Sequence, residues 1–157
     1  MPLHLRDLRD PVLLLATGFG AGLVPKAPGT AGTLVGVPLY LLLAPSPVWM
    51  YWMSVAVLFA AGVCLCSQAA QRLGDADPAP VVWDEIVGLL ITLGFTPLDW
   101  RWIFLGFILF RLFDALKPGP VGWLDRHVKG GIGIMLDDAA AALMAAACLV
   151  LMVRYGT

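Results

Sequence analysis

The stretch that decides the fold is residues 27–71, APGTAGTLVGVPLYLLLAPSPVWMYWMSVAVLFAAGVCLCSQAAQ, which contains no lysine, arginine, histidine, aspartate or glutamate. A stretch of this length can hold two membrane helices of roughly 20 residues each. Pro45-Ser46-Pro47 is the natural turn between them, and the aromatic residues that follow it suit a membrane interface. We therefore expect one helix over about 33–44 and a second over about 48–70.

The rest of the chain has the same apolar character in shorter pieces. Hydrophobic residues make up 60% of the 157 residues and charged residues 13%, against roughly 45–50% and 25% in soluble domains. Further apolar runs cover 81–95, 100–116 and 139–153. The first two are marginal for a full span, so they form either a tight helical hairpin or short spans supported by neighbours.

These patterns predict an all-α fold, a polytopic membrane helical bundle of about four or five apolar helices. The runs are continuous rather than alternating, which disfavours a membrane β-barrel. A single domain over 1–157 fits the length. The net charge of −1 excludes a nucleic-acid binder that relies on bulk positive charge. Basic residues are concentrated before residue 27 and in the loops 71–84 and 117–138, which the positive-inside rule assigns to the cytoplasm.

Two pairs of adjacent carboxylates are the strongest candidates for chemistry. Asp84-Glu85 interrupts the apolar run 81–95, and Asp137-Asp138 is expected to open the last helix. Each pair could simply favour a helix start, as a cap or through the helix dipole. Ionisable groups at membrane depth nevertheless mark function by default, and four carboxylates from two helices would suit Mg²⁺. We expect these four residues to be the metal ligands.

Two further segments supply candidate phosphate-binding groups. Arg111, Asp114 and Lys117 are spaced three apart, so they share one helix face, either as an ion-pair ladder or as a phosphate-facing strip in which Asp114 binds metal or orients a neighbour. Residues 25–33, PKAPGTAGT, combine glycines with a following helix N-terminus, which can cradle an anion. Lys26 and Thr30 are the candidate phosphate-binding residues there.

Three other patterns are weaker. Cys66 and Arg72 have the C-x5-R spacing of cysteine phosphatases, but the residues between them contain no glycine and favour a helix. Asp75-Ala76-Asp77 has the D-x-D pattern of aspartate-nucleophile phosphatases, but no hydrophobic strand precedes it. The only histidines, His4 and His127, do not suit a two-histidine phosphatase site. We therefore set all three aside.

Four segments together resemble the phosphatidylglycerophosphatase A family of bacterial membrane lipid phosphatases. They occur in the family's order and cover about 120 residues: 18–33, Val82-Trp83-Asp84-Glu85-Ile86-Val87-Gly88, Phe110–Pro118, and the stretch from Asp125-Arg126 through Gly130-Gly131-Ile132-Gly133 to Asp137-Asp138. Gly119 and Ala142 depart from the family's usual aromatic residue and glycine, and neither replaces a charged site residue.

The resemblance implies a Mg²⁺-dependent hydrolase of the bacterial cytoplasmic membrane, with its site facing the cytoplasm. It would remove the terminal phosphate of phosphatidylglycerol phosphate, and the product would feed anionic phospholipid synthesis. The expected catalytic residues are Asp84, Glu85, Asp114, Asp137 and Asp138, and the expected phosphate ligands are Lys26, Thr30, Arg111 and Lys117.

The residues leave two questions open. Attack by water and a covalent aspartyl-phosphate on Asp84 or Asp138 are both compatible with the pattern. A small oligomeric membrane transporter would also use intramembrane carboxylates and glycine-broken helices, and it is the alternative function.

Overall fold

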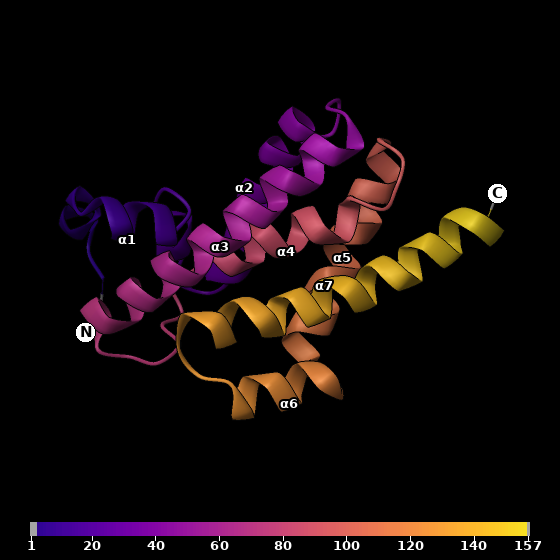
Figure 1. Ribbon diagram of the computed structural model, residues 1–157. Helices are drawn as coiled ribbons and strands as arrows, with labels where there is room; N and C mark the ends of the chain where they lie inside the picture. The colour runs from indigo at the N-terminus through magenta and orange to yellow at the C-terminus, as the bar shows by residue number, and fades with distance from the viewer. Residues whose placement is uncertain (1–2, 157) are drawn as a thin grey trace.

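The computed structural model describes residues 3–156, and this part of the chain is entirely helical, without strands. The all-α prediction is therefore confirmed. Figure 1 shows the α-helices, which are α1 (Pro11–Ala16), α2 (Pro28–Leu43), α3 (Val48–Leu73), α4 (Trp83–Leu93), α5 (Trp100–Leu116), α6 (Pro120–His127) and α7 (Gly130–Tyr155). Two short 3-10 helices, Leu5–Arg9 and Ala21–Leu23, flank α1.

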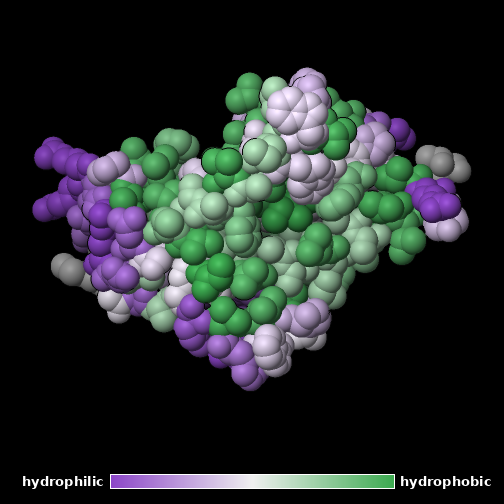
Figure 2. All heavy atoms as spheres, viewed as in Figure 1, coloured by the Kyte–Doolittle hydropathy of each residue, from purple (hydrophilic) through white to green (hydrophobic). Residues whose placement is uncertain are grey.

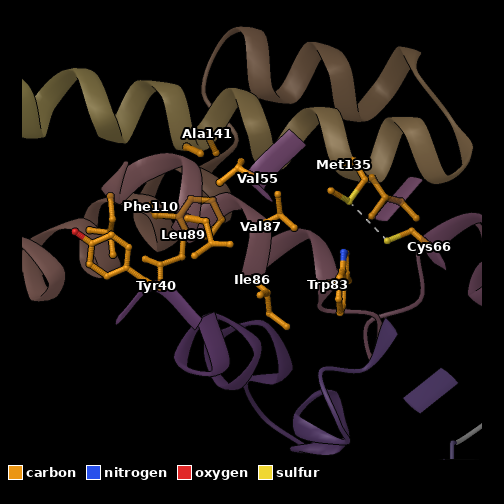
Figure 3. Packing of buried hydrophobic residues seen from close by; sticks show 14 of the residues in the cluster. Tyr40, Val55, Cys66, Trp83, Ile86, Val87, Leu89, Phe110, Met135 and Ala141 are labelled. Carbon is orange, nitrogen blue, oxygen red and sulfur yellow. Dashed lines mark hydrogen bonds between the residues drawn. The ribbon is translucent and has the colours of Figure 1, made fainter. Parts of the chain in front are cut away.

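The short helix α4 is the centre of the molecule. Helices α2, α3, α5 and α7 all contact it, and nine of its eleven residues are buried. Figure 3 shows Val87 and Leu89 of α4 among Phe110 of α5 and Ala141 of α7. Gly88 allows this packing, because a Cβ at that position would meet the Phe110 ring at 2.6 Å. The sequence left 81–95 open between a hairpin and a short span, and the structure makes it a short enclosed helix.

Local sequence signals set the helix ends. Proline stands at the first position of α2 and of α6, where its missing N–H is not needed. Helix α3 ends at Gly74 with φ +67°, a left-handed conformation that glycine adopts without strain. Helix α5 ends at Lys117, which precedes Pro118. The predicted turn at Pro45–Pro47 and the predicted helix over 100–116 are both confirmed.

Antiparallel packing brings the chemistry to one end of the bundle. The starts of α2, α4 and α7 and the ends of α3 and α5 meet there, beside α6, and we call this the site end. The opposite end carries the turns 44–47 and 94–99, which lie together around Tyr40 and Tyr51. Figure 1 shows the C-terminus at the opposite end from the loop that joins α6 to α7.

The start of α7 differs from the prediction. We expected the last helix over 139–153, but it begins at Gly130. Glycine disfavours helix interiors by about 1 kcal/mol each relative to alanine, which is why the sequence reads as a loop. Packing explains the difference: a Cβ at Gly131 would collide with the Val63 carbonyl of α3, and one at Gly133 would collide with the Val128 carbonyl. The glycines therefore permit close helix contacts rather than ending the helix.

Two of the described helices, α3 and α7, are long and apolar enough to cross a membrane. Each has 26 residues, or about 39 Å at the α-helical rise. Only 17% of the most apolar segment of α3 is buried, so most of its apolar side chains face outward. Figure 2 shows a broad apolar surface between hydrophilic groups at the two ends. These features indicate membrane association, whereas the predicted four or five spans are not confirmed.

Candidate active site

A cavity of about 490 Å³ opens at the site end, and residues of α2, α4, α5 and α7 and of the loops before α2 and α4 line it. All nine residues predicted from the sequence line it: Lys26, Thr30, Asp84, Glu85, Arg111, Asp114, Lys117, Asp137 and Asp138. Asp77 lines it as well. Six carboxylates thus face three basic side chains around one cavity, so its lining is strongly acidic and favours a cation.

Three of the four predicted metal ligands form a compact group, which we call the carboxylate cluster: Asp84, Glu85 and Asp138. One oxygen from each lies within 4.8 Å of the others. Asp84 is 8% exposed and Asp138 is 4% exposed. Among residues 3–156, the buried atoms Asp84 Oδ1, Glu85 Oε2 and Asp138 Oδ2 have no hydrogen-bond partner. Buried carboxylate oxygens left unpaired at this distance carry a desolvation and repulsion cost, which either a bound cation or a bound proton relieves.

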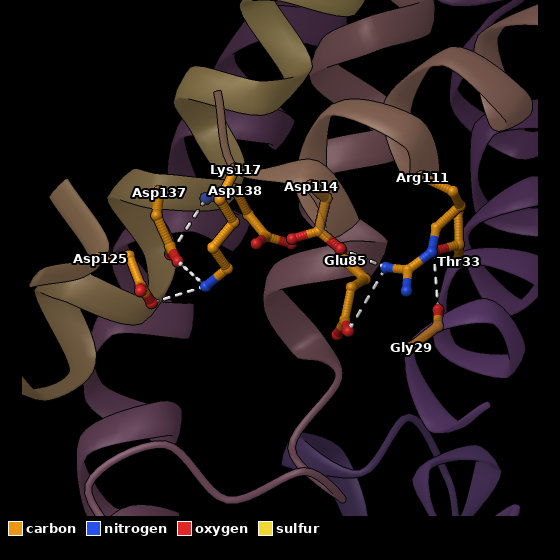
Figure 4. A network of polar contacts seen from close by, with 9 residues as sticks. All are labelled: Gly29, Thr33, Glu85, Arg111, Asp114, Lys117, Asp125, Asp137 and Asp138. Carbon is orange, nitrogen blue, oxygen red and sulfur yellow. Dashed lines mark hydrogen bonds and ion pairs between the residues drawn. The ribbon is translucent and has the colours of Figure 1, made fainter. Parts of the chain in front are cut away.

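Helix geometry explains which carboxylates meet. Asp84 and Glu85 lie in the first turn of α4, as expected. Asp137 and Asp138 lie two turns inside α7 rather than at its start, so the helix-cap interpretation of that pair is wrong. Adjacent helical residues point about 100° apart. Asp138 therefore joins the carboxylate cluster, while Asp137 points toward Lys117 (Figure 4).

Lys117 connects two acidic side chains rather than continuing the ladder of Arg111 and Asp114. Its ammonium donates to Asp125 Oδ1 at 2.6 Å and to Asp137 Oδ2 at 2.9 Å. Lys117 has φ +44°, a rare conformation for a residue with a side chain. Burial lowers the pKa of Lys117, but its bonds to the two carboxylates outweigh that effect and raise the pKa above its usual value. Hydrogen bonding to Lys117 likewise lowers the pKa of Asp125.

Arg111 is the main positive charge beside the cluster. Its Nη1 lies 2.5 Å from Asp114 Oδ2 and 3.6 Å from Glu85 Oε1, so of the two alternatives left open by the sequence, the ion pair is present between Arg111 and Asp114 (Figure 4). Gly29 of α2 packs directly against this arrangement. A Cβ at Gly29 would meet Arg111 Nη2 at 2.7 Å and would also collide with Glu85. The absence of a side chain at residue 29 thus allows the start of α2 to approach the charged groups.

We expect Gly29→Ala to reduce phosphatase activity by at least about 100-fold, because a misplacement of about 1 Å in a site costs that much. The added methyl group must displace both Glu85 and Arg111. Ala31→Gly is the matched control: it changes the same helical turn, costs about 1 kcal/mol of helix stability and should retain activity. Steady-state rates of the two purified variants would test this, and full activity of Gly29→Ala would show that the close approach is unimportant.

The start of α2 offers donors for an anion. Among residues 3–156, no side chain caps this helix, and its first residue is Pro28, so the amides of Gly29 and Thr30 remain for a ligand. Both residues line the cavity, as does Lys26. Lys26 is exposed, and no carboxylate of the described chain lies within ion-pair distance of it. The predicted anion cradle thus has a helix N-terminus and a lysine in the same cavity.

Sequence reasoning missed two residues of the site region. Asp77 was set aside with its D-x-D pattern, yet it lines the cavity. Asp125 was quoted only within a family segment, yet it holds Lys117. Asp77 reaches the cavity from a loop far from the other site residues in sequence, and Asp125 meets Lys117 across the break between α5 and α6, so no helical spacing indicated either role.

The structure gives no support to a cysteine- or histidine-based site. Cys66 lies inside α3 against Met135, so no phosphate-binding loop surrounds it, and Arg72 pairs with Asp10. Neither His4 nor His127 lines the cavity. The residues present therefore do not form a cysteine- or histidine-based phosphatase site.

Comparison with known proteins agrees with the acidic cavity. The sequence profile of phosphatidylglycerophosphatase A matches residues 14–153, which contain every predicted site residue. The chain belongs to the phosphatidylglycerophosphatase A family. It is 43% identical to phosphatidylglycerophosphatase A of Escherichia coli over 143 residues, which cover 90% of this chain and 83% of that protein.

Two further relatives support the family assignment. Phosphatidylglycerophosphatase A of Haemophilus influenzae is 43% identical over 92% of this chain and 90% of its own length. A Bacteroides thetaiotaomicron protein, provisionally named a phosphatidylinositol-3-phosphatase, is 39% identical over 83% of this chain and 86% of its own length. No solved structure matches significantly. Family membership makes this chain a phosphatase, and the acidic cavity is its candidate active site.

Proposed function

We propose that this protein hydrolyses phosphatidylglycerol phosphate to phosphatidylglycerol and inorganic phosphate with the help of Mg²⁺. The carboxylate cluster carries the proposal: three unpaired, buried carboxylate oxygens face a cavity that also holds Lys26, Arg111 and a free helix N-terminus. A cavity with cation ligands on one side and anion ligands on the other suits a phosphate monoester with a divalent ion. The transporter alternative has no support, since the family and the Escherichia coli and Haemophilus influenzae relatives are named as phosphatases.

The donor set fits Mg²⁺. Hard divalent cations prefer carboxylate oxygens, and Mg²⁺ uses few of them because it keeps several waters or substrate oxygens. Asp84, Glu85 and Asp138 would hold the ion, with Asp114 beside them; Asp137 would act through Lys117. When bound, the ion would neutralise phosphate charge and lower the pKa of a coordinated water.

Groups of the protein itself would bind the substrate phosphate and stabilise the charge on the leaving group. The amides at the start of α2 and the ammonium of Lys26 would bind the phosphate oxygens. Arg111 still has donors beyond those that pair with Glu85 and Asp114, and it would stabilise the charge that develops on the leaving group. Water would add to phosphorus as the ester P–O bond breaks, and the released alkoxide would take a proton to give the lipid alcohol.

Purified protein in detergent should release phosphate from phosphatidylglycerol phosphate with Mg²⁺ and lose that activity in chelator. Cys66→Ala is the control, because Cys66 packs against Met135 away from the cavity and should keep most of the activity. Phosphatidylinositol 3-phosphate should serve as the competing substrate. Undiminished release in chelator would reject the metal, and preference for the inositol lipid would reject the substrate.

We also propose that the site end faces the cytoplasm in a multi-pass arrangement. The exposed positive charges of Arg6, Arg9, Arg126 and Lys129 are all at that end. In intact bacteria, an impermeant thiol reagent should label a cysteine introduced at Ser46 but not one at Gly119, with Cys64, Cys66 and Cys148 replaced. The opposite labelling pattern would invert the orientation.

A further inference from the structure

Helix α6 and Lys129, which lies between α6 and α7, form an unusual surface beside the active site. After Pro120, the exposed side chains of α6 are Trp123, Arg126 and His127, and exposed Lys129 directly precedes α7. Trp123 is 54% exposed. Its ring stacks on that of His127, with centroids 4.8 Å apart and planes 17° from parallel. We call these four residues the α6 face.

The α6 face has little acidic character of its own. The only carboxylate of α6, Asp125, is turned toward Lys117, which neutralises it. Lys129 donates to the backbone carbonyl of Asp125 at 2.7 Å, which fixes the lysine and leaves its charge unpaired. Within residues 3–156, no carboxylate lies within ion-pair distance of Arg126 or Lys129. Asp77, Asp125 and Asp137 line a small cavity of about 40 Å³ beside Lys129, and none of them is within ion-pair distance of its ammonium.

The position of the α6 face limits what it can meet. Helix α6 packs along the start of α7, level with the acidic cavity and beside the apolar surface. Leu116 and Ile132, just outside the two ends of the segment 117–130, are both exposed. An exposed aromatic residue on the same short segment as unpaired cations, flanked in sequence by exposed apolar side chains, suits the boundary between acyl chains and phosphate groups.

We propose that the α6 face is a docking surface for the headgroups of anionic phospholipids in the surrounding bilayer. The guanidinium of Arg126 offers a fork that fits a phosphodiester, Lys129 supplies a second charge, and Trp123 inserts at the level of the glycerol backbone. Because Asp125 belongs to α6 and holds Lys117 of the site, lipid bound here lies directly beside the catalytic cavity.

The test measures lipid binding, so its result is independent of the proposed phosphatase activity. Immobilised full-length protein in neutral detergent micelles is incubated with fluorescent phosphatidylserine or phosphatidylcholine, and the retained lipid is quantified. Phosphatidylserine is anionic but has no terminal phosphate, so it does not probe the active site. We expect the wild-type protein to prefer phosphatidylserine. Arg126→Gln and Lys129→Gln should each weaken that binding by about five-fold, and the double variant by about 25-fold, since a basic residue near an anionic surface contributes about 1 kcal/mol.

Arg154→Gln is the matched control, because it removes one exposed positive charge at the opposite end of α7. It should change phosphatidylserine binding by less than two-fold. Equal weakening by Arg126→Gln and Arg154→Gln would overturn the proposal, because net charge alone would then explain binding. Equal retention of the two lipids by the wild-type protein would also overturn it. Displacement of phosphatidylserine by soluble polyglutamate would assign the α6 face to an acidic protein instead.

Discussion

Asp138→Asn should nearly abolish phosphate release while making the metal-free protein more stable. Asp138 is buried in the carboxylate cluster with Asp84 and Glu85, and one of its oxygens has no partner within the described residues. Without a cation the three carboxylates repel one another across a short, poorly solvated distance. Replacing one carboxylate by a neutral amide relieves that repulsion, so the melting temperature in chelator should rise.

The same change should remove the response to Mg²⁺. If the cluster holds the ion, Mg²⁺ at 100 times its dissociation constant should stabilise the wild-type protein by about 2.7 kcal/mol. The Asp138→Asn protein should gain far less and lose roughly 10³-fold in turnover, because a bound metal ion contributes several kcal/mol to transition-state charge stabilisation. The melting temperature in chelator should therefore rise while turnover falls, and a simple folding defect cannot produce this combination.

Thermal unfolding in detergent, with chelator and with Mg²⁺, checks the stability, and phosphate release checks the activity. Asp75→Asn is the matched control, because Asp75 is an exposed loop aspartate that does not line the cavity. It should leave both quantities unchanged. If Asp138→Asn destabilises the metal-free protein, or if it keeps near-normal turnover, Asp138 does not hold the ion.

Arg111→Gln should have the largest effect on stability. The guanidinium compensates both Glu85 and Asp114, which are mostly buried. Its removal leaves two carboxylates without their cation, and breaking a buried pair in this way costs 3–5 kcal/mol when burial is complete. Because the side chain of Arg111 is 23% exposed, we expect a smaller loss of about 2 kcal/mol, or a melting temperature lower by about 4–8 °C.

Turnover of Arg111→Gln should also fall, and two further variants separate the loss of stability from the loss of catalysis. Arg72→Gln breaks the ion pair with Asp10, whose two side chains are more exposed, so it should cost at most about 1 kcal/mol. Arg111→Lys keeps the charge but not the forked donors, so it should recover more of the stability than of the activity. Unfolding and steady-state assays on the three variants test this. A melting temperature for Arg111→Gln equal to that of Arg72→Gln would contradict the role of Arg111 beside the cluster.

The sequence alone singled out the candidate residues for the chemistry. Charges are so scarce in this chain that those within or beside apolar runs stand out, and Asp84, Asp114 and Asp138 were found in this way. It also determined the local features that depend on neighbouring residues. The turn at Pro45–Pro47, the helix over 100–116 and the pairing of Arg111 with Asp114 all follow from proline chemistry or helical spacing.

Only the tertiary structure decided which of these carboxylates face one another and which faces Lys117. The sequence gives no reason to separate Asp137 from Asp138, because the division depends on where α7 begins and on which neighbour each side chain faces. That start depends on the close approach of Gly131 to the Val63 carbonyl of α3 and of Gly133 to the Val128 carbonyl just before α7. Asp77 likewise reaches the cavity through packing between segments far apart in the chain, and Asp125 meets Lys117 because α6 turns back beside the end of α5. A local pattern does not contain the free energy of either arrangement.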